Sequence, residues 1–354
     1  MHIQSARLIP YSLPLRQQWQ SSMGGFSERK GWMIELSCTN GVKGYGDCAP
    51  LQVAGTETPE VAKQWLEKQL STTEGKSPSE LLRRCTAGIP QPPAACFALE
   101  TALLDLIGQS EQVTLRRWLS AKATDHVLVN AVIGTLDDSI EKRALYKIEQ
   151  GFTTLKIKVG VRRPQDELAQ LHELAQQLAE KIRLRLDANR AWNLRDAEYF
   201  IDGVRGLPID SIEEPLREPD LKLLAKLQHR ADCSLALDES LAQLHIDKLL
   251  VHPPVKRFIL KPMVIGGLLC ARKLAESAAA ANVECVVTTT VDSAVGVLAT
   301  AQLAAAIPSS RHLAQGLATS EWLAEDIAEP LAVINGEMVL PGTHGLGIGP
   351  ITTA

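Results

Sequence analysis

Charged residues recur at the ends of short apolar runs in the middle of the chain, at intervals of 23 to 29 residues. The interval is about the length of one strand, one helix and two loops. In a barrel of parallel strands the carboxyl ends meet at one mouth, where such enzymes carry their chemistry. The spacing therefore predicts an enzyme whose site is built from lysines and carboxylates. These residues are Lys158, Asp187, Glu213, Asp238 and Lys261.

Lys156 and Lys158 lie two residues apart on a predicted strand, so their side chains leave the same face. Two ammonium groups inside a barrel are costly to bury unless negative charge is nearby. Each ammonium also makes the other harder to protonate, which would let one of them act as a base near neutral pH. The alternative is two exposed lysines on an edge strand, and the three acidic strand ends that follow favour the functional interpretation.

Asp187, Glu213 and Asp238 end three successive predicted strands. Carboxylate oxygens from three directions are ligands that Mg²⁺ prefers, with Mn²⁺ as the alternative ion. Acidic residues at strand ends can instead cap the next helix, but the shared spacing favours a metal site. The pattern does not choose between Glu213 and Glu214, because neighbouring strand residues face opposite sides.

The elements that would position these residues fall into two parts. Residues 1–125 combine strands with a following run of helices, which is typical of an α+β domain. Residues 126–319 alternate strand and helix, and eight strands are predicted between 127 and 316, as a (β/α) barrel requires. Leu331–Leu340 is predicted as a strand returning to the first domain, so that about residues 320–354 would complete it.

The bulk composition excludes several classes of function. A net charge of −4 gives no basic footprint for nucleic acid. No apolar run is long enough to span a membrane, and the first residues do not resemble a signal peptide, so a cytoplasmic protein is expected. The seven cysteines are scattered without a C-x-x-C pair, which predicts buried free thiols.

Taken in this order, the motifs resemble the enolase superfamily and, more closely, its muconate-lactonizing branch. The run Leu184–Trp192 is most similar to o-succinylbenzoate synthases of menaquinone or phylloquinone biosynthesis. The resemblance covers most of the chain, including Gly46–Pro50 in the first domain. The other matching strings are Leu155–Lys158, Ile212–Pro215, Ala236–Ser240 and Ile259–Pro262.

The resemblance implies a fold of the α/β class, a modified (β/α)7β TIM-like barrel with an α+β capping domain and the active site between them. It implies Mg²⁺ held by Asp187, Glu213 and Asp238, with the first glutamate of the pair as the ligand. Lys158 would then lie next to the reacting carbon and Lys261 on the opposite face. Lys156 would help to hold Lys158 at a useful pKa.

The implied substrate is a small carboxylate, and the implied reaction is a dehydration through an enediolate. It converts 2-succinyl-6-hydroxy-2,4-cyclohexadiene-1-carboxylate to 2-succinylbenzoate. In our hypothesis Lys158 removes the α proton and then assists the leaving hydroxyl, while Lys261 stays protonated. Loops at Ser22–Gly24 and Leu51–Gly55 are expected to close over the substrate. The expected substrate contacts are Arg185, Asn189, Thr288, Thr289 and Gly316.

A dipeptide epimerase or an N-acylamino acid racemase is the main alternative, with Lys158 and Lys261 as acid and base. Dipeptide epimerases place Asp-x-Asp at the eighth strand, whereas Ala314–Thr319 has no carboxylate here. A muconate cycloisomerase is a weaker match, since only Asp292 could loosely stand in for its acidic group. A non-catalytic barrel would be expected to have lost a ligand or a lysine. The oligomeric state stays open.

Overall fold

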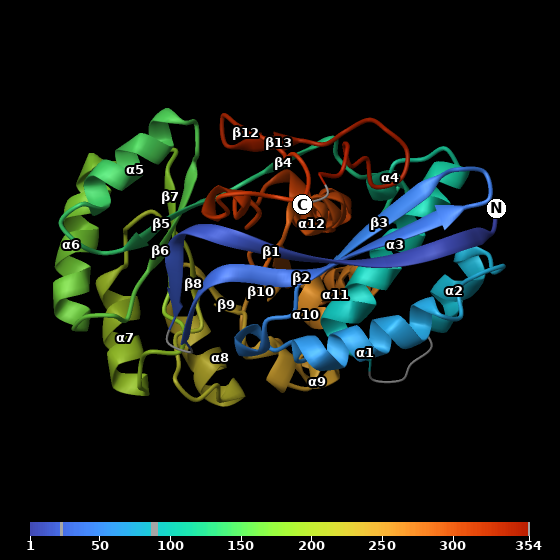
Figure 1. The fold of residues 1–354 in the computed structure, drawn as a ribbon. Coiled ribbons are helices and arrows are strands. Elements are labelled where there is room, and N and C mark those ends of the chain that lie inside the picture. The colour runs from blue at the N-terminus through green and yellow to red at the C-terminus, as the bar shows by residue number, and fades with distance from the viewer. Residues whose placement is uncertain (22–23, 86–90, 353–354) are drawn as a thin grey trace.

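A three-stranded antiparallel sheet and a curled parallel sheet form the two parts of the molecule (Figure 1). The structure is a computed structural model that describes residues 1–21, 24–85 and 91–352. The expected α/β fold with a separate antiparallel capping domain is confirmed.

The capping domain is built on strands β1 (Ile3–Ser21), β2 (Gly24–Cys38) and β3 (Lys43–Cys48), in that order. Helix α3 packs against β3 so closely that a Cβ on Gly46 would collide with the carbonyl of Ala98. Almost all of α3 is buried, because it lies between this sheet and the barrel. The other elements are η1 (Gln52–Ala54), α1 (Pro59–Leu70), α2 (Pro78–Cys85), α3 (Pro93–Ser110) and α4 (Leu115–Leu119).

The barrel part contains seven parallel strands that are hydrogen-bonded in chain order, from β5 to β11. They are β5 (Ala131–Thr135), β6 (Thr154–Lys158), β7 (Arg183–Asp187), β8 (Ile209–Glu213), β9 (Ser234–Leu237), β10 (Arg257–Leu260) and β11 (Glu284–Val287). The helices between and after them are α5 (Ile140–Glu149), α6 (Pro164–Gln177), α7 (Leu194–Gly203), α8 (Leu221–Arg230), η2 (Leu241–Gln243), α9 (Ile246–Val251), α10 (Pro262–Ile265), α11 (Leu268–Ala280) and α12 (Ala294–Ala306).

Two of the eight predicted strands differ from the prediction. The first divides into β4 (His126–Leu128), which pairs outside the barrel, and β5. The last, at 312–315, forms no regular strand and follows the short helix η3 (Pro308–Arg311). It still closes the seam, because the Gln315 amide donates to the Leu128 carbonyl over 2.7 Å and the Gly316 amide donates to Val287 over 2.9 Å.

The predicted strand at Leu331–Leu340 is wrong in both form and place. The segment is a hairpin of β12 (Val333–Ile334) and β13 (Glu337–Val339), and β13 pairs with β4. Asn335 and Gly336 both have positive φ, at 53° and 74°, which suits the tight turn of such a hairpin. The C-terminal segment instead meets the capping domain before and after this hairpin. Its contacts include an isolated bridge from Leu323, just after η4 (Ser320–Trp322), to Leu15, and a hydrogen bond from the Leu346 amide to Asp105.

All seven cysteines are free thiols, as predicted. Cys270 is exposed and Cys85 and Cys233 are half-buried, so only the remaining four are fully buried. In the part of the chain that the structure describes, no helix is long and apolar enough to cross a membrane.

Candidate active site

The two lysines of β6 leave the same face of the strand but have different surroundings. The Lys156 Nζ lies 2.8 Å from the Asp187 Oδ2 and 2.5 Å from the Glu213 Oε2. Lys158 is the register partner of Asp187, one layer nearer the mouth. Its ammonium has no hydrogen-bond or ion-pair partner among the described residues. The paired lysine is therefore Lys156, and the free one is Lys158.

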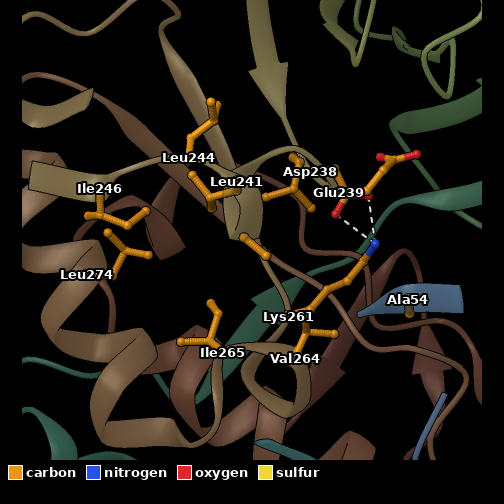
Figure 2. A pocket seen from close by; sticks show the side chains of 12 residues that line it. Ala54, Asp238, Glu239, Leu241, Leu244, Ile246, Lys261, Val264, Ile265 and Leu274 are labelled. Atoms are coloured by element: carbon orange, nitrogen blue, oxygen red, sulfur yellow. Dashed lines mark hydrogen bonds and ion pairs between the residues drawn. The ribbon is translucent and has the colours of Figure 1, made fainter. Parts of the chain in front are cut away.

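The three predicted metal ligands come from neighbouring strands. Asp187 and Glu213 are register partners at the ends of β7 and β8, and Asp238 follows the last residue of β9. Lys261, directly after β10, approaches Asp238 with 2.7 Å between Nζ and Oδ1 (Figure 2). The predicted series of lysines and carboxylates therefore lies together at the carboxyl ends of the strands.

Lys158 and Lys261 come from opposite sides of this mouth. Three strands, β7, β8 and β9, separate β6 from β10 in the sheet order. In a barrel of about eight strands, two strands that are four apart in the sheet order lie on opposite sides of the barrel. A substrate carbon between the two lysines would have an amine on each face.

The electrostatics of the cluster follow from burial and close charges. Burial lowers the pKa of Lys156, but Asp187, Glu213 and Asp238 outweigh it and raise that pKa above the ordinary value. Burial raises the pKa of Glu213, and so do Asp187 and Asp238, although Lys156 opposes them. The mutual repulsion of these carboxylates means that the cluster attracts cations.

The structure separates the roles of Glu213 and Glu214. Glu213 points toward Lys156, whereas Glu214 has a φ of +45° and turns away. The Glu214 carboxylate accepts hydrogen bonds from the Asp238 amide, over 2.7 Å, and from the Ser240 amide and hydroxyl. Glu214 therefore holds the loop that carries Asp238. The sequence pattern gave no sign of this role.

The carboxylates are not grouped as a ready-made metal site. Within the residues that the structure describes, no three His, Cys, Asp or Glu side chains converge closely enough to hold a metal ion as they stand. The reason is visible in the ion pairs, since Lys156 bridges Asp187 and Glu213 while Lys261 holds Asp238.

The donor chemistry nevertheless fits Mg²⁺. All the candidate ligands are hard carboxylate oxygens, and ammonium groups already neutralise them as stand-in cations. Next to Asp238, the buried Oε2 of Glu239 has no hydrogen-bond partner, while its Oε1 accepts from Asn189 over 3.2 Å. An unsatisfied buried carboxylate oxygen at this point favours a further cation or donor.

Arg185 does not lie where a substrate could reach it. It is 1% exposed, and its Nε lies 2.7 Å from the Asp210 Oδ2. Its guanidinium also donates to the carbonyl of Ala314 and to the side-chain oxygen of Asn130, so it is engaged within the barrel core. Asp210 reaches the barrel interior because the β7–β8 pairing shifts at this point, and it also binds Arg257. The predicted substrate contact of Arg185 is replaced by a buried ion-pair network.

The other predicted contacts are largely engaged within the protein. The Thr288 hydroxyl donates to the Gly316 carbonyl over 2.8 Å, and the hydroxyls of Thr289 and Thr319 lie 2.6 Å apart. A Cβ on Gly316 would collide with Thr288, so this glycine is needed for seam packing whatever else it does. Asn189 is half-buried and contacts the acidic cluster directly, because its backbone amide donates to the Asp187 Oδ1 over 3.1 Å and its side-chain amide donates to Glu239.

The expected capping loops are described only in part. Residues 22–23 lie outside the described residues. The second loop, around η1, does meet the barrel, because a Cβ on Gly55 would lie 3.4 Å from the Val264 Cγ1.

A buried acid pair at the boundary between the two parts was missed by the sequence analysis. The Tyr11 hydroxyl lies 2.5 Å from the Asp47 Oδ1, and the Ser293 amide donates to the Asp47 Oδ2. Burial and the nearby Asp292 raise the pKa of Asp47 to about 7. Asp47 lies in the family-like segment Gly46–Pro50, but only tertiary packing brings Asp292 beside it.

The fold and the charged mouth define a capped barrel with lysines and carboxylates gathered at the carboxyl ends of its strands. The family model "Enolase C-terminal domain-like" matches residues 139–353, and the model of the mandelate racemase / muconate lactonizing enzyme N-terminal domain matches residues 5–119. The chain therefore belongs to the enolase superfamily, with both domains of the mandelate racemase and muconate lactonizing enzyme group.

Relatives of assigned activity span several reactions of this superfamily. An L-amino acid-D/L-Glu epimerase of Francisella philomiragia is 25% identical, over 95% of this chain and 96% of its own length. A chloromuconate cycloisomerase of Cupriavidus pinatubonensis is also 25% identical, over 98% and 96% of the two chains.

Among the solved structures that are similar to this chain is a dipeptide epimerase of Enterococcus faecalis. Its complex with Mg and the dipeptide L-Leu-L-Tyr has a TM-score of 0.86 at 25% identity, covering 99% of this chain and all of that one.

Proposed function

We propose that this protein is an enzyme that removes the proton α to a substrate carboxylate, with Lys158 as the base. The observation that carries the proposal is the difference between the two lysines of β6. Lys156 is held by Asp187 and Glu213, while Lys158 is half-buried beside them and has no partner within the described part of the chain. An unpartnered amine at the mouth is available to take a proton.

The proposal also includes a Mg²⁺ site formed by the carboxylates of Asp187, Glu213 and Asp238. When bound, Mg²⁺ supplies the positive charge that stabilises the negative charge developing on the substrate carboxylate. Lys156 holds two of the acids in place. Lys261, across the mouth, can offer a proton or a fixed positive charge to the opposite face of the reacting carbon.

Proton transfer at an amino acid derivative is the first candidate for the net reaction. The named relatives support it, since they include epimerases of dipeptides and an N-succinyl-L-Arg/Lys racemase of Bacillus cereus. The eighth segment restricts the substrate. Residues 314–319 contain no carboxylate, and the Gln315 side chain is used by the Val287 amide and the Leu313 carbonyl. This favours an acylated amine over a free ammonium group.

The dehydration of 2-succinyl-6-hydroxy-2,4-cyclohexadiene-1-carboxylate is the second candidate. Two observations favour it: the run Leu184–Trp192 and the same absence of a carboxylate in residues 314–319. It would use Lys158 for the same proton abstraction, and Lys261, paired with Asp238, would only need to stay charged.

One panel of assays separates the candidates. Purified protein with Mg²⁺ is incubated in D₂O with N-succinylamino acids and dipeptides, and α-deuterium incorporation is followed by NMR. The cyclohexadiene carboxylate is assayed in parallel by absorbance. Exchange without dehydration supports the racemase or epimerase, and dehydration supports the synthase. Inactivity with every member of the panel would contradict the proposal.

A further inference from the structure

A cavity of about 270 Å³ lies directly beside the ion pair of Lys261 and Asp238 (Figure 2). It forms where β9 and β10 separate. Their pairing ends at Leu237 and Phe258, after which one chain enters η2 and the other enters α10. Side chains of η2, α9, α10 and α11 line the space that opens between them.

The wall of this cavity is apolar except on one side. The charged residues of the described lining, Lys261, Asp238 and Glu239, lie at the rim shared with the candidate active site. The apolar wall includes Leu241, Leu244, Ile246, Val264, Ile265 and Leu274. A ligand that fits both sides would carry a charged group at the rim and an apolar group inside.

The capping domain also contributes to the cavity. Ala54 of η1 is part of the lining, and the neighbouring Gly55 faces Val264 closely. Both parts of the molecule therefore line the cavity. Because residues of both parts and of the candidate active site line it, the cavity differs from a closed packing defect within one core.

We propose that this cavity is a subsite for a hydrophobic substituent of the substrate, a branched aliphatic or aromatic group near the reacting carbon. An apolar cavity of roughly 150 Å³ is known to hold benzene, so about 270 Å³ accommodates a phenyl group with its linker. Burial of such a group against apolar walls contributes to binding in proportion to its area. The inference rests on the proposed function and adds its substrate class.

Two ligands that differ only in the side chain test this subsite: N-succinyl-L-phenylalanine and N-succinyl-L-alanine. Their affinities for the full-length protein with Mg²⁺ are measured by calorimetry, and their α-proton exchange by NMR. Val264→Phe fills the cavity, and Ile246→Phe fills it from the half-buried helix α9 if the first variant does not fold. The matched control is Val251→Phe on the same helix, where the side chain is 70% exposed.

We expect the wild type and the control to bind the phenylalanine derivative about tenfold or more tightly than the alanine derivative. The filled variants should lose this preference while their affinity for the alanine derivative changes less than about twofold. A wild type without preference, or a preference that survives in the filled variants, overturns the subsite. Exchange without side-chain preference would leave the proposed function intact. Preferential binding without exchange would support the subsite and contradict the function.

Discussion

Lys156 and Lys158 project from the same face of β6, yet among the residues that the structure describes carboxylates bind Lys156 and not Lys158. Lys156 starts one layer deeper and extends toward the mouth to reach Asp187, although Lys158 is the register partner of that aspartate. Lys156 therefore neutralises Asp187 and Glu213 from the deeper layer of the barrel. Lys158, nearer the mouth, is left without an ion pair among the described residues. It gives the two members of a K-x-K motif separate roles.

Loss of Lys156 should cost stability as well as activity. Lys156→Ala leaves Asp187 and Glu213 buried without their ammonium, and removal of one partner from a buried ion pair typically costs about 3–5 kcal/mol. Urea unfolding of the variant measures this. A stability equal to that of wild type would contradict the assigned role of Lys156.

Mg²⁺ should stabilise the folded protein as well as support turnover. Binding to the native state alone adds about 2.7 kcal/mol at a concentration one hundred times the dissociation constant. We expect the melting temperature to rise with Mg²⁺ and to fall again with EDTA. In Asp187→Asn the rise should shrink, and a full rise in that variant would remove Asp187 from the ligand set.

Arg185 should behave as a structural residue. Arg185→Met is expected to destabilise the barrel by roughly 3 kcal/mol, because Asp210 loses one of its two buried arginines. Substrate KM should stay within about twofold of wild type if the fold persists, since no uniform binding interaction is removed. A large rise in KM at unchanged stability would restore the substrate contact that the sequence suggested.

The contribution of Asp47 to the stability of the protein should fall as the pH rises from about 4 to about 7. Asp47 has a pKa of about 7 in the folded chain and 3.8 as an ordinary aspartate, so the folded state binds the extra proton between these values. The contribution is present at low pH and is lost as the pH rises through 7. Asp47→Asn keeps an acceptor for Tyr11 and cannot ionise. Its melting temperature should therefore vary less with pH, and an unchanged profile would contradict this account.

The sequence predicted the parts of the fold that follow from periodicity. The strands ending at Lys158, Asp187 and Glu213 were located because apolar runs and charges repeat at a regular interval. The predicted strand at 312–315 is not formed, and isolated bridges close the barrel there instead. Such bridges leave no repeating pattern of apolar residues in the sequence. The hairpin after Leu331 pairs with β4 through tertiary packing that no local pattern specifies.

The sequence predicted the lysines and carboxylates at the strand ends, but it predicted the contacts of the neighbouring residues less well. Arg185 lies two residues before Asp187 on the same strand face and so one layer deeper, but alternation could not show that it meets Asp210 there, because Asp210 reaches the interior through a shift in the β7–β8 pairing. The left-handed backbone of Glu214 and its hold on the Asp238 loop were equally hidden. Pairings between distant segments decide such details.

The most direct test of the central claim is α-proton exchange in Lys158→Ala. The variant is compared with wild type in D₂O with Mg²⁺, using a carboxylate that the wild type exchanges, and circular dichroism checks the fold. Because Lys158 has no partner in the described structure, the variant should fold normally and keep its stabilisation by Mg²⁺. We predict that exchange falls by about 10²- to 10⁴-fold, as expected for a lost general base. Exchange within tenfold of wild type would contradict the assignment of Lys158 as the base.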